Sequence, residues 1–544
     1  MTRSTNISLL KIFFGKIYRM LFFIFNHTPL PSPYLPKAIA QVGLLTFSFL
    51  LSPSSLSSQT YAPADPFYLL SIEKEQFKNA DSLQISSTMI RPFYIPHKKG
   101  QLILRYRQEQ YFNDNTSNQE NMDVRFIGKG RGWFQGLNIS YYNDFIAFSV
   151  EPYWLSSAND SVLVISRPGV YSVLNDSHIK PDGQFISSGF REAQFYLHFK
   201  GLGIGISNAS MWWGPGIHNS ITMTNNTNGF KNYMIGTIRE LRWQKLGLNA
   251  RLTLSQLNEL ESPDAVFYTA LTGLFSYHGS TEISIGFSRN YLSGGVDIGI
   301  PWEMNDAMNL ILEDLFLVDK KDLYYTQNLN IPDAGVWNWD PWDQVISGFV
   351  SISIPTVGTN VYFEIATGDH RASRGDLLTQ PDHDTVAMFG IRKYGFFDQP
   401  DLVLVFEYSR LIKSYSHIFR SSGGFGGYDY YDYNTFEGRR WTAHSGADSD
   451  DLLLMFGYLS NKWVFLPGFN YERHGVVSYR IPEVKMEFRL DTRYKYKDVW
   501  FNLYYEYQHE QHLGFTKDNV YLDEATGLRF TNTIMLGIEK IIYF

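Results

Sequence analysis

From Gln101 to the C-terminus, apolar and polar residues alternate with a period of two. One clear segment places Ala193, Phe195, Leu197 and Phe199 between Glu192, Gln194, Tyr196, His198 and Lys200. The same pattern recurs at residues 282–287, 485–491 and 501–508. Because successive side chains of a strand point to opposite faces, each of these strands has one apolar face and one charged or amide-bearing face.

This alternation predicts a transmembrane antiparallel β-barrel, an all-β fold, and disfavours a soluble sandwich. It continues to Phe544 without a clear amphipathic helix, and Tyr and Phe gather near strand ends as an aromatic girdle requires. At roughly 25 residues for a strand and its connection, the region holds about 16 to 20 strands. We expect four charged side chains to face the lumen: Glu192, Lys200, Glu487 and Arg489. Three apolar side chains are expected to face lipid: Phe195, Leu197 and Phe488.

The C-terminal strand supports the same interpretation. It carries Ile534, Leu536, Ile538, Ile542 and Phe544 on one face, interrupted by Lys540. A terminal Phe on such a strand resembles the signal read by the barrel-assembly machinery, which is therefore an expected partner. The alternative, an edge strand of a soluble sheet, would leave an aromatic edge prone to aggregation.

The first 99 residues do not alternate and divide into two regions. Residues 1–62 hold two apolar stretches, and the second follows Lys37 and ends in small residues. That order predicts a secretory signal cleaved near Gln59 or Ala62. An inner-membrane anchor is the alternative for the first stretch, and Met20 could be the true start. Residues 63–99 are expected to form a periplasmic segment with a helix near 67–74, and residues 100–544 the barrel.

Composition agrees with a barrel of the Gram-negative outer membrane in contact with lipid. The 36 Tyr, 41 Phe and 12 Trp make 16% of the chain, which is heavy for a soluble enzyme. A mean hydropathy of -0.21 does not oppose this, because half of each barrel strand faces the lumen. There is no cysteine, so disulfides and thiolate chemistry are excluded. The net charge of -7 gives no reason to expect a nucleic-acid partner.

One motif stands out among the strands. Trp212 and Trp213 run into the turn Gly214-Pro215-Gly216, and Asn225-Asn226 follows. Indole faces stack on sugar rings, and amides pair with hydroxyl groups. The alternatives are that one tryptophan anchors an aromatic girdle or packs the turn, and that the asparagines pair with backbone groups inside the lumen. The two glycines are expected to serve the backbone.

At this motif the sequence resembles the capsule-assembly Wzi family, whose pattern is a Trp-Trp-Gly-Pro-Gly turn followed by a hydroxyl residue and Asn-Asn. Further matching pieces lie at residues 128–132, 288–295, 466–468 and 471–475. The chain departs from the pattern at Thr227-Asn228-Gly229, where the family has a small residue and then proline. The resemblance implies an eighteen-stranded barrel with a small helical part closing the periplasmic side. It also implies a surface lectin that holds capsular polysaccharide.

The candidate glycan ligands come from this motif and from long connections. They are Trp212, Trp213, Asn225, Asn226, Trp337, Trp339, Trp342, Tyr430 and Arg439. The tryptophans near 340 could form a glycan platform or pack over the barrel mouth. The run around Tyr430 has the Tyr, Gly and Asp composition of adaptable recognition loops, or it is a flexible loop.

No catalytic residue, cofactor or metal is predicted, although a hydrolase has to be weighed. His383 lies beside two aspartates, and His444 precedes Asp448 and Asp450, but nothing fixes a catalytic spacing. Asp448, Asp450 and Asp451 lack the glycine and terminal Glu of an EF-hand loop.

We predict a barrel that binds capsular or other surface polysaccharide and helps assemble or retain it. A porin-like diffusion channel is the alternative, and the alternating charges at 485–491 favour a plugged lumen.

Overall fold

The computed structural model describes residues of one compact unit of the chain, Leu56–Phe544. They are 61–62, 66–78, 88–94, 101–117, 120–177, 180–257, 265–294, 302–316, 342–368, 378–412, 434–515 and 527–544. Apart from Tyr61 and Ala62, the predicted signal region lies outside them, so its extent and the three-region division stay predictions.

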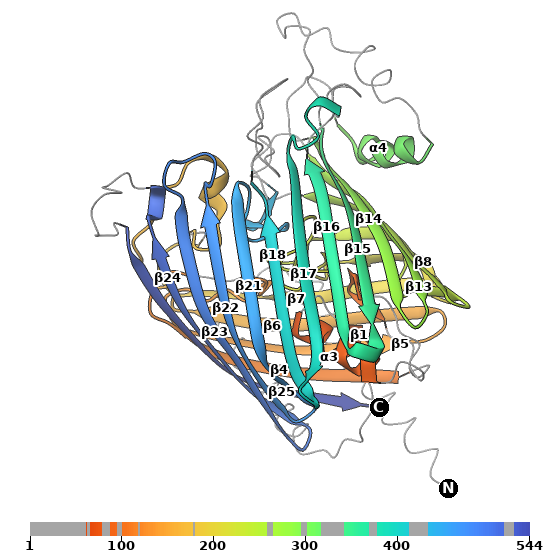
Figure 1. Ribbon diagram of the computed structural model, residues 1–544, viewed down its shortest axis with the longest axis horizontal. Coiled ribbons are helices and arrows are strands. Elements are labelled where there is room, and N and C mark those ends of the chain that lie inside the picture. The colour runs from red at the N-terminus through yellow and green to blue at the C-terminus, as the bar shows by residue number, and fades with distance from the viewer. Residues whose placement is uncertain are drawn as a thin grey trace, which may run out of the picture. The chain divides into compact units, whose positions relative to one another are not determined.

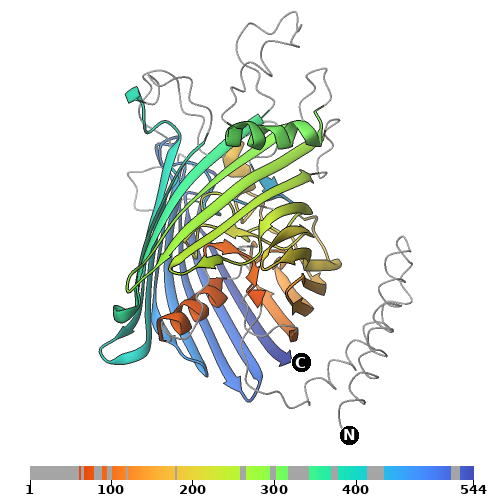
Figure 2. The same cartoon turned by 90° about the vertical axis from the view of Figure 1, so that its right-hand side faces the viewer.

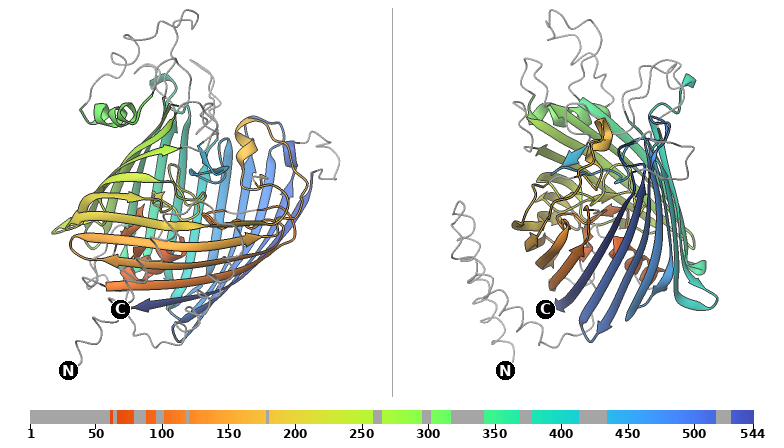
Figure 3. Two further views of the ribbon diagram at one scale, coloured as in Figure 1. Left: turned by 180° about the vertical axis from the view of Figure 1, so that it is seen from behind. Right: turned by 90° about the vertical axis from the view of Figure 1, so that its left-hand side faces the viewer.

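The described wall strands close into an antiparallel barrel (Figures 1 and 3). β10 (Asn232–Thr237) and β11 (Leu241–Trp243) both pair with β12 (Leu246–Leu257), so they share one place in the wall and the barrel has 18 strands. The other wall strands are β4 (Gln101–Asn113), β5 (Gly130–Tyr142), β6 (Ile146–Ser157), β7 (Phe185–Phe199), β8 (Leu202–Ser207), β13 (Val266–His278), β14 (Glu282–Gly294), β15 (Trp342–Ile354), β16 (Thr359–Gly368), β17 (Thr385–Phe396), β18 (Gln399–Arg410), β21 (Ser449–Leu459), β22 (Trp463–His474), β23 (Glu483–Tyr496), β24 (Val499–Gln511) and β25 (Arg529–Tyr543). The predicted fold class is confirmed, and β25 closes the wall against β4.

The predicted lipid and lumen faces are confirmed at most of the positions named. Phe195 and Phe488 are 44% and 55% exposed on the outer surface, whereas Glu192 and Glu487 are buried inside. Leu197 is also exposed, and the Arg489 side chain lies inside beside Glu487. This separation follows from the period-two geometry of a strand in a wall with lipid outside and polar groups within.

The prediction for Lys200 is wrong. β7 ends at Phe199, and Lys200 stands exposed in the turn that follows, with a φ of 53°. Its position continues the polar register of the strand, but the strand has already ended. Hydrophobic alternation does not reveal where a strand gives way to a tight turn.

The predicted N-terminal helix is confirmed as α3 (Pro66–Lys78), which lies inside the barrel near the end that carries the C-terminus (Figure 2). Leu69 and Leu70 are buried in one cluster with wall residues that include Val403. Glu73 accepts hydrogen bonds from Arg392 Nε at 2.6 Å and from Tyr394 OH at 2.6 Å. The helix is therefore fixed to the inner wall by an apolar face and a buried ion pair.

A second helix, α4 (Met304–Phe316), lies at the opposite end of the barrel and was not expected (Figure 1). It buries Ala307, Leu310 and Ile311, and the last two share a cluster with Tyr291 and Trp342. The spacing of three and four residues is helical, but it occupies only a short part of a long connection, so the surrounding alternation hides it. Neither of the two described helices is long and apolar enough to cross a membrane.

The remaining described elements are short. They are β1 (Tyr61–Ala62), β2 (Ile90–Arg91), β3 (Phe93–Tyr94), β9 (Trp212–Trp213), β19 (Thr435–Phe436), β20 (Arg439–Arg440), η1 (Gly169–Val173), η2 (Pro355–Val357) and η3 (Leu513–Phe515). β2 pairs with β9, which ties the residues before the barrel to the tryptophan motif.

Candidate functional site

Residues 208–231, here called the plug segment, turn inward between the short strands β8 and β10. Residues 209–227 are all buried. Trp213 pairs with Ile90 and Trp212 with Arg91, so the motif forms a small sheet with β2. The sequence motif thus lies inside the barrel.

Trp212 and Trp213 have no exposed surface. The Arg91 guanidinium lies 4.6 Å from the centre of the Trp212 ring, and the Trp213 ring stacks on Tyr268 at 6.4 Å. This burial supports a structural role for both rings, and sugar binding by them stays a prediction.

The Gly214-Pro215-Gly216 turn is held by two arginines. Arg91 Nη2 donates to Gly216 O at 3.0 Å, and Arg392 Nη1 donates to Pro215 O at 2.7 Å. Gly214 has a φ of 132°, which side chains disfavour. A Cβ on Gly216 would lie 2.0 Å from the carbonyl oxygen of Asn219. Both glycines therefore serve the backbone.

Gly216→Ala is expected to destabilise the folded barrel by about 1–3 kcal/mol, because the added methyl group displaces backbone in a packed turn. Gly348→Ala is the matched control, since a Cβ there meets no atom within 4 Å. The free energy of unfolding in lipid vesicles distinguishes the two variants. Equal stability of both would contradict the close packing of the turn.

Asn225 and Asn226 bind other parts of the plug. Asn225 Nδ2 donates to Asn121 O at 3.0 Å. Asn226 Nδ2 donates to Arg440 O at 3.1 Å and to Asn175 Oδ1 at 3.0 Å. These contacts favour the backbone-pairing interpretation for both amides, and glycan binding by them stays a prediction.

The other candidate ligands are spread over the structure. Arg439 is buried, with its guanidinium 5.5 Å from the Phe126 ring. Trp342 is largely buried where its ring stacks on Trp302. The remaining three lie outside the described residues: Trp337, Trp339 and Tyr430. The described candidates therefore do not gather into one exposed surface.

No sequence motif indicates the group that anchors the plug segment. The Glu407 carboxylate of β18 accepts three backbone N–H groups, from Ile217 at 2.9 Å, His218 at 3.2 Å and Asn219 at 2.6 Å. Tyr362 OH donates to the same carboxylate at 2.6 Å. The alternation of β18 places Glu407 on the lumen face, but no neighbouring residue in the sequence indicates which groups bind its carboxylate.

The described plug residues are packed against the inner wall, since residues 209–227 are all buried, and small cavities lie beside them. One cavity of about 20 Å³ is lined by Thr222, Tyr268 and Trp441, and another of about 10 Å³ is lined by His444, Glu472 and Lys485, among other residues. Each holds on the order of one water molecule. This packing fits the plugged lumen predicted from the alternating charges.

A larger cleft lies on the outer surface where β5 begins and β6 ends, away from the C-terminal end of the barrel. Its volume is about 500 Å³. Its side-chain lining includes Arg131, Trp133, Trp154, Ser156, Asp160 and Gln184. The two indole rings meet edge to face at 5.0 Å. Half-buried indoles beside charged and amide groups have the chemistry that binds sugars, and they also suit an aromatic girdle. Trp133 and Trp154 lie on separate strands, so no single run of the sequence predicts this cleft.

The closed wall and its apolar outer face define an integral β-barrel of a Gram-negative outer membrane. No family model matches the chain, and no curated protein matches it. Among solved structures, it is similar to the Escherichia coli outer-membrane protein Wzi, which is described as involved in group 1 capsule assembly and as a carbohydrate-binding β-barrel. The two are 11% identical, with 88% of this chain and 99% of that chain covered and a TM-score of 0.57, which shows a shared fold.

Other solved structures also match, at lower structural similarity. Pseudomonas aeruginosa OpdQ is 9% identical, with 82% of this chain and all of that chain covered and a TM-score of 0.37. OccK7 (OpdD) of the same organism is 10% identical, with the same coverage and a TM-score of 0.38.

Proposed function

We propose that this barrel binds capsular or other surface polysaccharide and helps assemble or retain it at the cell surface. The observation that carries the proposal is the buried plug segment inside the barrel, in a fold shared with a carbohydrate-binding barrel over nearly that chain's whole length. A diffusion channel needs an open path, whereas a lectin uses its outer surface and can keep its lumen closed. The alternative porin-like function is therefore less well supported.

The cleft at Trp133 and Trp154 is the described surface best suited to this function. An indole face can stack on the C–H face of a sugar, while Arg131, Asp160 and Gln184 offer donors and acceptors for hydroxyl groups. Each contact is weak, but a repeating polymer engages many barrels at once, so retention gains from multivalency. Trp337, Trp339 and Tyr430 lie outside the described residues and remain candidate glycan ligands.

Replacing Trp133 and Trp154 together by alanine is expected to release capsule into the medium while the barrel still assembles. Loss of two stacking rings should weaken each site about tenfold, which corresponds to about 1.4 kcal/mol. The amounts of cell-bound and released polysaccharide report capsule retention. The heat-modifiable migration of the barrel on gels reports its assembly. Trp463→Ala is the matched control, because its ring pairs with Tyr494 at 4.2 Å on the outer face at the opposite end of the barrel.

Equal release by the control and the double variant would assign the cleft tryptophans to the aromatic girdle. The porin alternative is tested separately, by single-channel conductance of the purified barrel in lipid. Two results together would overturn the lectin proposal: a large, steady conductance of the purified barrel, and normal capsule retention in a strain that lacks the protein.

A further inference from the structure

A second cleft on the outer surface, here called the wall groove, lies beside the cleft at Trp133 and Trp154. Its volume is about 460 Å³. Aliphatic and aromatic side chains make up most of its outward lining, and two amides lie at one edge. Its lining includes Gln108, Gln110, Phe501, Leu503, Leu536 and Ile538, from β4, β24 and β25. Phe501, Leu503 and Leu536 are exposed on the outer face, where lipid surrounds a membrane barrel.

The strand register joins the two clefts. Trp133 of β5 is paired with Gln110 of β4, and Gln110 is paired with Leu536 of β25. Leu536 is paired in turn with Leu503 of β24. Residues directly opposite on neighbouring strands lie on one face with Cβ atoms about 4.5–5.5 Å apart. The two clefts therefore adjoin at Gln110 and Trp133.

This line of paired residues descends through the wall. Trp133 lies near the beginning of β5, at the end of the barrel that carries α4, whereas Leu503 lies near the beginning of β24, at the opposite end. Figures 1 and 3 show β6, β4 and β25 following one another in that direction. Long connections such as the one that holds α4 are extracellular in bacterial barrels. The cleft at Trp133 and Trp154 thus lies toward the cell exterior, and the wall groove lies deeper in the bilayer.

Two amides stand where the clefts meet. Gln110 is exposed on the outer face, and its side chain makes no hydrogen bond within the described part of the chain. Gln108 Oε1 accepts a hydrogen bond from Tyr106 OH at 2.9 Å, which leaves the Gln108 Nε2 donor available. An amide without a hydrogen-bond partner is costly in hydrocarbon. A ligand with an ester or amide carbonyl at this level would accept from both side chains.

We propose that the polysaccharide bound by this barrel carries a lipid anchor. Its acyl chain lies in the wall groove, and its first sugars lie in the cleft at Trp133 and Trp154. Down the wall, indoles with charged side chains are followed by amides and then by apolar side chains, which is the order of sugars, linkage and acyl chain in a glycolipid. The groove has about fifteen times the volume of a water molecule, and a methylene group is of similar size, so one acyl chain fits. This inference rests on the proposed function, because it names the kind of polysaccharide that the same site takes.

The groove positions the acyl chain more than it attracts it. A chain that moves from lipid into the groove gains no hydrophobic free energy, so packing and the amide hydrogen bonds supply the preference. Contributions of this kind correspond to about a three- to tenfold preference. A chain held there also raises the effective concentration of the attached sugars at the cleft, which strengthens weak sugar binding.

The test uses the full-length barrel in lipid vesicles. The probe is a fragment of the cell's own surface polysaccharide that carries a photoactivatable palmitoyl chain, amide-linked at its reducing end. After illumination, mass spectrometry locates the labelled residues. We expect labelling of β4, β24 and β25 to exceed labelling of β21 about three- to tenfold, and fragments without a chain to compete for it. A phospholipid with the same photoactivatable chain is the control for ordinary lipid contact and should label the outer face evenly.

Two variants test the groove itself. Leu536→Trp should fill it and reduce its labelling about three- to tenfold, while fragments without a chain bind unchanged. Leu454→Trp is the matched control, because Leu454 is 43% exposed at the middle of β21, compared with 54% for Leu536, and lines neither cleft. Gln110→Leu should reduce the labelling by removing the amide donor. Gln135→Leu is its control, because Gln135 is an outward amide outside both clefts.

The possible failures are distinguishable. If fragments without a chain do not bind, the proposed function is wrong, and this inference falls with it. If they bind but the chain-bearing probe labels β21 as strongly as the groove, the lipid anchor is refuted and the lectin function stands. Equally selective labelling by the phospholipid would assign the groove to ordinary membrane lipid. Barrel dimers that Leu536→Trp dissociates would assign it to a second copy of the chain, and either result would overturn the inference.

Discussion

Glu407→Ala is expected to free the plug segment while the barrel wall stays folded. The substitution removes the acceptor for the backbone N–H groups of Ile217, His218 and Asn219. Each buried N–H left without a partner costs about 1–3 kcal/mol, so the plug should lose at least about 3 kcal/mol. The wall keeps its ladder of strand hydrogen bonds, which does not depend on this carboxylate.

Hydrogen exchange of residues 209–227 measures the loss directly, and conductance in a lipid bilayer reports any opening of the lumen. Tyr362→Phe is the matched control, because it removes one donor to the same carboxylate at a cost of only about 0.5–1.5 kcal/mol. Unchanged exchange in Glu407→Ala would show that apolar packing, and not this carboxylate, holds the plug.

The sequence predicts the wall well because the wall obeys a local rule. Phe195 and Phe488 are correctly assigned to the lipid face, since the side chains of any extended strand alternate. The rule has two limits. The alternation rule places Lys200 in a strand that ends one residue earlier. It also gives no sign of the helix α4, which lies within a long connection.

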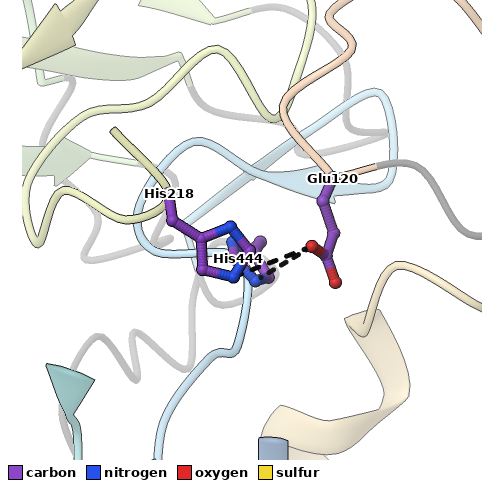
Figure 4. A group of neighbouring side chains, drawn as sticks. All are labelled: Glu120, His218 and His444. Carbon is purple, nitrogen blue, oxygen red and sulfur yellow. Dashed lines mark ion pairs between the residues drawn. The ribbon is translucent and has the colours of Figure 1, made fainter. Parts of the chain in front are cut away.

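The interior is harder to predict because its partners are distant in the chain. Sequence proximity suggested grouping His444 with Asp448 and Asp450. In the structure Asp448 accepts a hydrogen bond from Tyr171 OH, and Asp450 pairs with Arg473. His444 instead lies near Glu120 (Figure 4) and near Asp451. No local pattern encodes contacts that barrel closure alone brings together, so these ion pairs and the Glu407 anchor were missed.

Phe488→Arg is expected to reduce the free energy of unfolding in lipid vesicles by about 2–4 kcal/mol, because Phe488 faces outward midway along β23 and the guanidinium would lie near the bilayer midplane. Tyr496→Arg is the matched control on the same strand. Tyr496 is equally exposed but ends β23, so the same charge there should cost about 0–1 kcal/mol.

Denaturant titration of both variants refolded into the same vesicles gives the two costs. A large difference between them requires that lipid covers the middle of the strand and headgroups cover its end. Equal costs at the two positions would mean that the outer face of β23 meets one uniform environment, as the outer face of a soluble barrel does. That result would contradict the membrane location on which the capsule proposal depends.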